Sequence, residues 1–80
     1  GIIGIYMKKR KALLCLSALA QDSRLAIFRL LMDTGETGLS AGAISEALGV
    51  PATTLSFHLS QLSTASLIKF RKEGRSVIYY

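Results

Sequence analysis

The sequence predicts a mainly α-helical domain that ends in a small β-hairpin. Three features of residues 40–80 carry this prediction. A run of apolar residues with helical spacing stops at Gly49-Val50-Pro51, and a second helical run follows at once. Two β-rich runs then flank a Glu-Gly pair near the C-terminus. Hydrophobic spacing and turn residues together predict a helix, a tight turn, a second helix and a hairpin.

The first helix of this pair has clear end signals. Its apolar positions are Ala43, Ile44, Ala47 and Leu48. Ser40 can accept a hydrogen bond as the N-cap, and Gly49 can adopt the left-handed conformation that ends a helix. Pro51 suits the first turn of the next helix, where its missing N–H is no loss.

The second helix has two contrasting faces. At about 100° per residue, one face collects Ala52, Leu55, Leu59, Leu62 and Ser66, which we expect to pack inward. The opposite side carries Thr53, Phe57, Ser60, Gln61 and Thr64, and the flanks carry Thr54, Ser56 and His58. These residues are uncharged and, apart from Phe57, polar. Hydroxyl and amide groups can bond base edges and phosphates, and an apolar group can meet a thymine methyl. This face therefore suits a DNA major groove.

The hairpin is predicted from residues 67–71 and 76–80, with Glu73-Gly74 in the turn. Arg71, Lys72 and Arg75 gather at its tip. Cations on a protruding loop beside a groove-reading helix are suited to contact phosphates.

This order of elements is that of a winged helix-turn-helix, and the residues resemble the ArsR/SmtB family of bacterial repressors over roughly residues 12–80. The residues that carry the resemblance are the run from Asp22 to Leu31, then Leu39-Ser40, Ile44, Leu48-Gly49, the run from Thr54 to Leu59, Leu62, Glu73-Gly74-Arg75 and Tyr79. The resemblance implies a homodimer that binds an operator and is released by a metal, a metalloid such as arsenite, or thiol oxidation.

The first 39 residues are predicted to support this DNA-reading unit of residues 40–80. We expect helices over 8–20 and 24–33, the second capped by Asp22 or Ser23. Leu39 is expected to pair with the hairpin as a short strand. The full order is then two helices, a short strand, two helices and two strands, in a domain spanning residues 8–80, with residues 1–7 as an apolar, turn-prone extension without assigned function.

Each supporting helix has a predicted apolar face. In the first helix it is formed by Ala12, Leu16, Leu19 and Ala20, with Leu13 and Leu14 broadening it toward a second subunit. In the second helix the predicted core stripe is Leu25, Phe28, Leu31 and Met32, with Ile27 and Leu30 widening it. Arg24 and Arg29 are expected to be surface or ion-pair residues.

Size and charge favour a dimer and a polyanionic partner. A chain of 80 residues buries only about 60–65% of its unfolded surface. Half of its residues are hydrophobic, so burial in a homodimer would add stability. The net charge of +5 fits operator DNA, although many small domains are basic for other reasons.

Cys15 is the single cysteine and a weak candidate ligand for arsenite or another soft metal. Such metals favour several thiolates, so Cys15 would need a partner across a dimer. The simpler interpretation is a structural cysteine in a reducing cytoplasm. The cysteine pair of the resembled family is absent near residues 41–45. Two roles for His58 stay open, namely contact with DNA, and packing or hydrogen bonding within the domain.

Catalysis has no support in the sequence. The five acidic residues are scattered, and no catalytic triad, phosphate loop or clustered metal ligands can be recognised. The basic cluster at 8–11 and the apolar run 12–20 resemble a short secretory signal, but they continue into an amphipathic helix. No segment reaches the ~20 apolar residues that span a membrane.

We therefore expect a cytoplasmic, non-enzymatic repressor that binds an inverted-repeat operator as a dimer. An alternative from another class is a winged-helix protein-interaction module without DNA binding, which the uncharged helix and the outward Phe57 would suit. The domain could also be part of a larger sensor.

Overall fold

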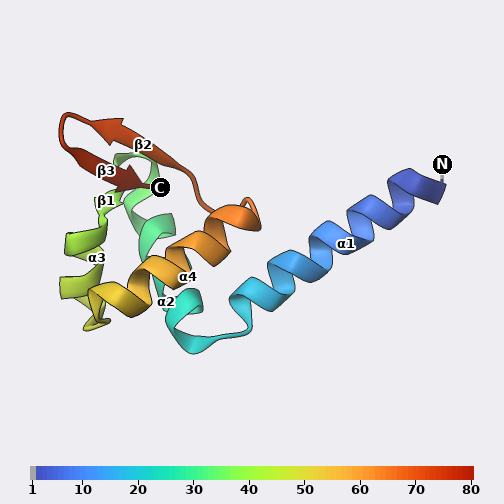
Figure 1. Ribbon diagram of the computed structural model, residues 1–80, viewed down its shortest axis with the longest axis horizontal. Coiled ribbons are helices and arrows are strands. Elements are labelled where there is room, and N and C mark those ends of the chain that lie inside the picture. The colour runs from blue at the N-terminus through green and yellow to red at the C-terminus, as the bar shows by residue number, and fades with distance from the viewer. Residues whose placement is uncertain (1) are drawn as a thin grey trace.

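The computed structural model describes the backbone of residues 2–80 and the side chains of residues 8–80. Figure 1 shows helix α1 projecting from a body made of the other elements. In chain order, the elements are α1 (Ile2–Leu19), α2 (Asp22–Thr34), the short 3-10 helix η1 (Gly35–Thr37), β1 (Leu39–Ser40), α3 (Ala41–Leu48), α4 (Ala52–Thr64), β2 (Phe70–Glu73) and β3 (Ser76–Tyr79). This order confirms the predicted winged helix-turn-helix.

The three strands form one antiparallel sheet in the order β1-β3-β2. Leu39 pairs with Tyr79 on one side of β3, and Phe70 pairs with Tyr79 on the other. The predicted short strand at Leu39 is therefore confirmed. Backbone hydrogen bonds between Lys69 and Tyr80, at 2.7 and 2.9 Å, extend the hairpin at its open end.

The first hairpin strand begins later than the sequence suggested. The predicted strand of residues 67–71 is observed only from Phe70, because the preceding residues close the end of α4. The Leu67 N–H donates to the Leu62 carbonyl at 3.0 Å, and Ser66 has a positive φ of 60°. Ser66 thus occupies the left-handed position that usually favours glycine.

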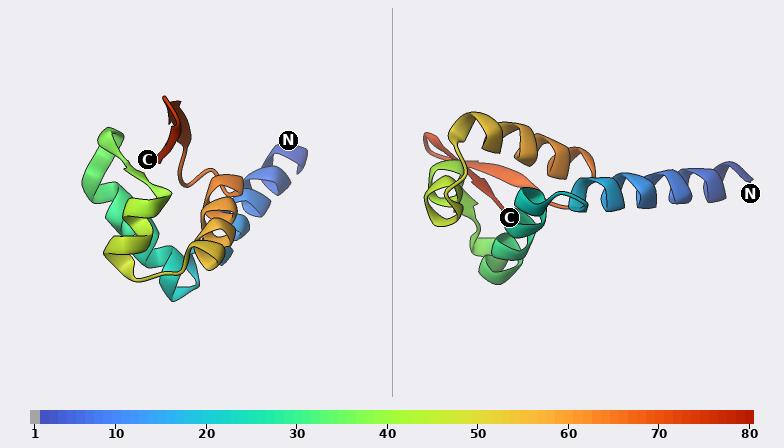
Figure 2. Two further views of the ribbon diagram at one scale, coloured as in Figure 1. Left: turned by 60° about the vertical axis from the view of Figure 1, so that its left-hand side comes forward. Right: turned by 90° about the horizontal axis from the view of Figure 1, so that it is seen from below.

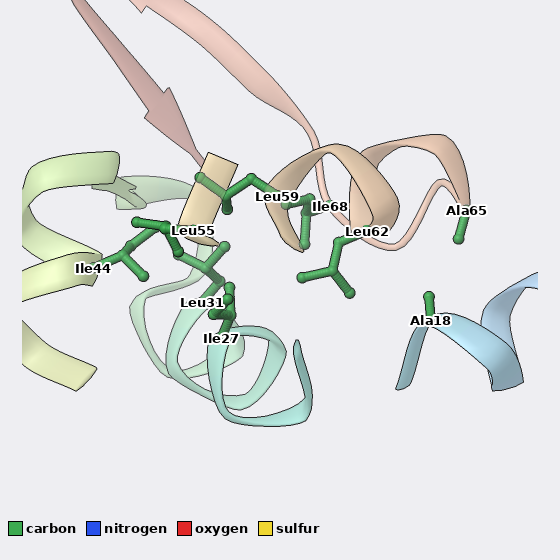
Figure 3. Packing of buried hydrophobic residues seen from close by; sticks show 9 residues of the cluster. All are labelled: Ala18, Ile27, Leu31, Ile44, Leu55, Leu59, Leu62, Ala65 and Ile68. Carbon is green, nitrogen blue, oxygen red and sulfur yellow. The ribbon is translucent and has the colours of Figure 1, made fainter. Parts of the chain in front are cut away.

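The core lies between α2, α3 and α4 (Figure 3). Three leucines of α4, Leu55, Leu59 and Leu62, point into it as predicted, towards the α2 and α3 side chains. The other buried members are Ala18, Ile27, Leu31, Ile44, Ala65 and Ile68. Ala52 and Ser66 were predicted to lie on the inward face of α4, but both are exposed because they fall beyond the segment that rests on α2.

The core stripe predicted for α2 is rotated in the structure. Ile27 and Leu31 are fully buried, whereas Leu25 and Met32 are exposed. A wide apolar surface does not define which line of residues faces the partner helices, and the contacts with α3 and α4 select the 27–31 line. The helix also starts earlier than predicted, and its cap is neither Asp22 nor Ser23, because the Gln21 side chain accepts from the Arg24 N–H at 2.9 Å.

Helix α1 differs most from its prediction. It begins at Ile2 rather than residue 8, so residues 2–7 are helical and not a turn-prone extension; Gly1 lies outside the described residues. Its contact with the body is made by Ala18, with Cys15 and Leu19 partly buried. The predicted face is mostly turned to solvent, since Leu13, Leu14 and Leu16 are all exposed.

Ser40 and Gly49 cap the two ends of α3 as predicted, whereas Pro51, predicted in the first turn of α4, is its N-cap. The Ser40 hydroxyl accepts from the Ala43 N–H at 3.2 Å. Gly49 ends α3 with φ 67° and ψ 26°, in the left-handed region, and its N–H donates to the Ser45 carbonyl at 2.8 Å. The Ser45 hydroxyl also donates to the Val50 carbonyl, which ties the turn to α3.

Replacing Gly38 by alanine should destabilise the domain more than replacing Gly35. Both glycines have positive φ and extended ψ, so each alanine costs about 1–3 kcal/mol of backbone strain. At Gly38 alone, an added Cβ would also approach the Tyr79 carbonyl oxygen to 2.3 Å and Ile78 Cγ2 to 2.8 Å, whereas Gly35 faces open space. Chemical denaturation should give an excess loss of about 1–3 kcal/mol for Gly38→Ala. Equal losses in the two variants would contradict the close approach of β1 to β3.

Candidate nucleic-acid interface

The outer face of α4 is exposed and uncharged. Figure 1 shows α4 crossing in front of α2, and the right-hand view of Figure 2 places α4 along the edge of the molecule opposite α2. We call this outer face the α4 surface; its members are Thr53, Thr54, Ser56, Phe57, Ser60, Gln61 and Thr64, all exposed in the structure. Phe57 is 58% exposed, so this face presents one large apolar side chain among its polar groups.

The chemistry of the α4 surface is that of hydrogen bonding rather than charge. No charged residue occurs between Pro51 and Ser66. The Ser56 hydroxyl donates to the Ala52 carbonyl at 3.2 Å, so its oxygen remains able to accept. The surface as a whole can therefore donate and accept hydrogen bonds next to one apolar group, as base edges in a major groove require.

The cations of this region lie on the hairpin, which extends on the side of the molecule opposite the start of α1 (Figure 1). Lys72 and Arg75 are exposed near its tip. Arg75 lies in the turn with Gly74, whose φ is positive as predicted, at 61°. The side chains of Lys72 and Arg75 can reach outward to phosphates.

Arg71, the third predicted cation of the hairpin, has several partners within the domain. Its guanidinium donates to the Glu36 carbonyl at 2.7 Å and to the Thr37 carbonyl at 3.0 Å. It also pairs with Glu73 at 2.9 Å and stacks on the Tyr80 ring, with 4.9 Å between its Cζ and the ring centroid. These donors hold the hairpin against η1, and a phosphate contact of Arg71 stays a prediction.

His58 is also turned away from the α4 surface. Its exposed fraction is 6%, and its Nδ1 lies 3.2 Å from Arg24 NH1. Since arginine can only donate, Nδ1 accepts and the neutral ring carries its proton on Nε2. Burial, and secondarily the Arg24 charge, lowers the pKa of His58 below its ordinary value of 6.5. Of the two roles left open by the sequence, this geometry favours packing within the domain over contact with DNA.

Arg24 makes two contacts that the sequence did not predict, with His58 and with the Ala18 carbonyl. Besides bonding His58, its Nε donates to the Ala18 carbonyl at 2.6 Å, near the end of α1. The sequence placed Arg24 at the surface or in an ion pair, because helical spacing says nothing about a carbonyl six residues earlier. Residues of α1, α2 and α4 thus meet at one guanidinium.

Cys15 is partly buried where α1 meets the end of α4. Its thiol donates to the Ala65 carbonyl at 3.4 Å. Within the described part of the chain, no group of three His, Cys, Asp or Glu residues could hold a metal ion. No helix among the described residues is long and apolar enough to cross a membrane.

Comparison with known proteins agrees with this geometry. The family described as "Helix-turn-helix domain" matches residues 19–69, which contain α2, α3 and α4. Among solved structures, HlyU from Vibrio cholerae superposes with a TM-score of 0.79 at 36% identity, covering 90% of this chain and 75% of that one. An ArsR-like transcriptional regulator from Rhodococcus also gives a TM-score of 0.79, at 25% identity, covering 90% of this chain and 65% of that one.

The chain belongs to the ArsR/SmtB family of transcriptional regulators. Curated relatives include the transcriptional activator HlyU of Vibrio cholerae, 38% identical over 69 residues (86% of this chain, 61% of the relative). The HTH-type transcriptional regulator YceK of Bacillus subtilis is 41% identical over 59 residues (74% of this chain, 58% of the relative). This chain therefore spans about three fifths of the length of these two relatives. Both relatives are named as regulators of transcription, and this chain shares the helix-turn-helix domain.

Folding stability should depend on pH through His58, the only histidine of the chain. Its pKa is lowered in the folded state, so the unfolded chain binds more protons in the range just below 6.5. The stabilisation is therefore fully present above pH 6.5 and is lost as the pH falls through the folded-state pKa. Urea denaturation between pH 8 and 5 should show this loss in the wild type.

The control is His58→Asn, which keeps an acceptor at the Nδ1 position but does not titrate. Its stability should fall less over the same pH range. The same pH dependence in both proteins would contradict the assignment of this loss to His58.

Proposed function

We propose that this protein is a homodimeric repressor that binds an inverted-repeat operator through α4 and the hairpin. The observation that carries the proposal is the α4 surface: an exposed helix face of hydroxyls, one amide and one phenyl ring, without any charge. A face exposed only to water would ordinarily carry lysine and glutamate. Hydroxyl and amide groups can bond base edges, and an apolar group can meet a thymine methyl.

The proposed contacts divide by chemistry. Thr53, Thr54, Ser56, Phe57 and Gln61 would read base edges or bond nearby phosphates. Lys72 and Arg75 would contact the phosphate backbone from the hairpin. His58 and Arg71 are left out of this set because the His58 Nδ1 and the Arg71 guanidinium already have partners inside the domain.

The proposed dimer uses the apolar side of α1. Leu13, Leu14 and Leu16 are 58%, 48% and 67% exposed on one helix. A second copy packing on α1 would bury these leucines and would add apolar burial that the small core lacks. Two α4 helices could then enter successive major grooves, about 34 Å apart along the duplex.

The releasing signal we propose is a soft metal, arsenite or oxidation acting at Cys15, in the cytoplasm where operator DNA is available. A metal would need further ligands, such as Cys15 of a second protomer, because soft ions favour more than one thiolate. Adding arsenite or an oxidant to the protein–DNA complex, with Cys15→Ser as the control, tests whether this thiol is the sensor.

A second candidate is a protein-interaction module, and exposed Phe57 is the feature that favours it. The two functions are separated by selecting duplexes from a random pool with the purified protein. Enrichment of an inverted repeat, and repression of a reporter placed behind it, would support the proposal. Failure to enrich any sequence at low salt would favour the interaction module.

Arg75→Ala should weaken binding to all duplexes alike. A lost phosphate contact reduces the number of released counterions, so the slope of log K against log salt should flatten by about one unit. Affinity measured at several salt concentrations checks this. Arg29→Ala, which removes an exposed cation of α2, is the matched control and should keep the slope.

Gln61→Ala provides the contrast in the same assay. A residue that reads bases should change the preference among operator variants more than the overall affinity. An unchanged slope for Arg75→Ala would remove the hairpin from the DNA contact, and a uniform loss for Gln61→Ala would make Gln61 a positioning contact only.

Leu16→Glu should shift the protein from dimer to monomer, because it places a charge in the proposed α1 interface. Met32→Glu is the matched control, since Met32 is 65% exposed on α2, close to the 67% of Leu16. Sedimentation equilibrium should show a monomer only for the α1 variant. A dimer that survives Leu16→Glu would exclude this part of α1 as the interface.

A further inference from the structure

Arg24 lies where the proposed dimer helix meets the DNA-reading helix. Its Nε donates to the Ala18 carbonyl at 2.6 Å, and its NH1 donates to His58 Nδ1 at 3.2 Å. Carbonyls in the last turn of a helix have no partner within that helix, and the helix dipole favours a cation there. One rigid guanidinium therefore joins the end of α1 to the middle of α4.

Apolar burial of α1 against the body is limited over residues 8–19. Ala18 is its only fully buried residue among residues 8–19, and Cys15 and Leu19 are partly buried. The thiol of Cys15 adds a hydrogen bond to the Ala65 carbonyl, but a thiol is a weak donor. With so little apolar burial, a bridge through Arg24 is well placed to influence the angle between α1 and α4.

We propose that Arg24 is a positioning residue that sets the placement of α4 relative to α1 by bridging the Ala18 carbonyl and His58. This inference rests on the proposed function, because in a dimer joined through α1 that placement determines the separation of the two α4 helices. A change in the separation weakens binding at both half-sites together. Arg24 would thus affect operator affinity without touching DNA.

The bridge also depends on the protonation state of His58. A proton on His58 Nδ1 removes the acceptor and sets a second positive charge against the guanidinium. Among the described residues, the charged side chain that contacts the ring is Arg24 of α2, and the Phe57 ring lies 6.0 Å away on α4 itself. The acidic residues of the two packed helices α2 and α3, namely Asp22, Asp33 and Glu46, are exposed, and α1 contributes none over residues 8–19. Acid therefore opens the bridge with no carboxylate at the ring to compensate.

The first test compares variants in operator binding between pH 7.5 and 5.5, using a duplex enriched from the random pool. Arg24→Lys keeps the charge but lacks the fork that makes both bonds, so affinity at pH 7.5 should fall about tenfold. Arg29→Lys is the control and should bind like the wild type. Wild-type affinity should decrease toward pH 5.5, whereas His58→Asn should bind normally at pH 7.5 and lose less on acidification.

The second test needs neither DNA nor a variant. In a nuclear magnetic resonance titration of the wild type, the backbone amides of Ala18 and Leu19 in α1 should shift with the same midpoint as the His58 ring. This result would support the bridge even if the protein binds no duplex. Absence of duplex binding would refute the proposed function but not the bridge. The inference would be overturned if the amide shifts of α1 did not follow the His58 titration. Identical pH profiles of operator affinity for wild type and His58→Asn would also overturn it.

Discussion

Burial of one edge of α4 is the constraint on which the other features depend. Leu55, Leu59 and Leu62 are almost completely buried against the side chains of α2 and α3. Because these residues are three or four apart, their burial determines the rotation of the helix about its axis. The opposite edge must then face outward, and in this chain that edge carries threonines, serines, a glutamine and Phe57.

A second set of contacts holds the hairpin beside this helix. Arg71 ties β2 to the carbonyls of Glu36 and Thr37, and its guanidinium also stacks on Tyr80. Gly38 allows the backbone before β1 to lie close to Tyr79. The hairpin is therefore braced near its base, while Lys72 and Arg75 stay exposed near the tip. The base of the hairpin is thus held in place, and its tip carries exposed positive charge.

Arg24, Arg71 and Arg75 show how residues of one type acquire different roles. Arg24 and Arg71 both donate to main-chain carbonyls of other elements, so their charges serve the internal geometry. Arg75 has an exposed side chain at a turn, where a charge is well solvated until a polyanion approaches. In a protein with net charge +5, only part of the positive charge is thus placed for contact with DNA.

The sequence by itself determined the order of elements, the turn from α3 to α4, the leucine edge of α4 and the family. These features depend on local spacing and on residues such as Ser40 and Gly49, whose conformational preferences act over a few positions. Only the tertiary structure decided that His58 is buried, that Arg71 bonds to η1, and that Ile27 rather than Leu25 is buried. It also decided that Leu13, Leu14 and Leu16 of α1 remain exposed. Those outcomes depend on which partner lies across from each side chain, often more than thirty residues away, and helical periodicity carries no information about that partner.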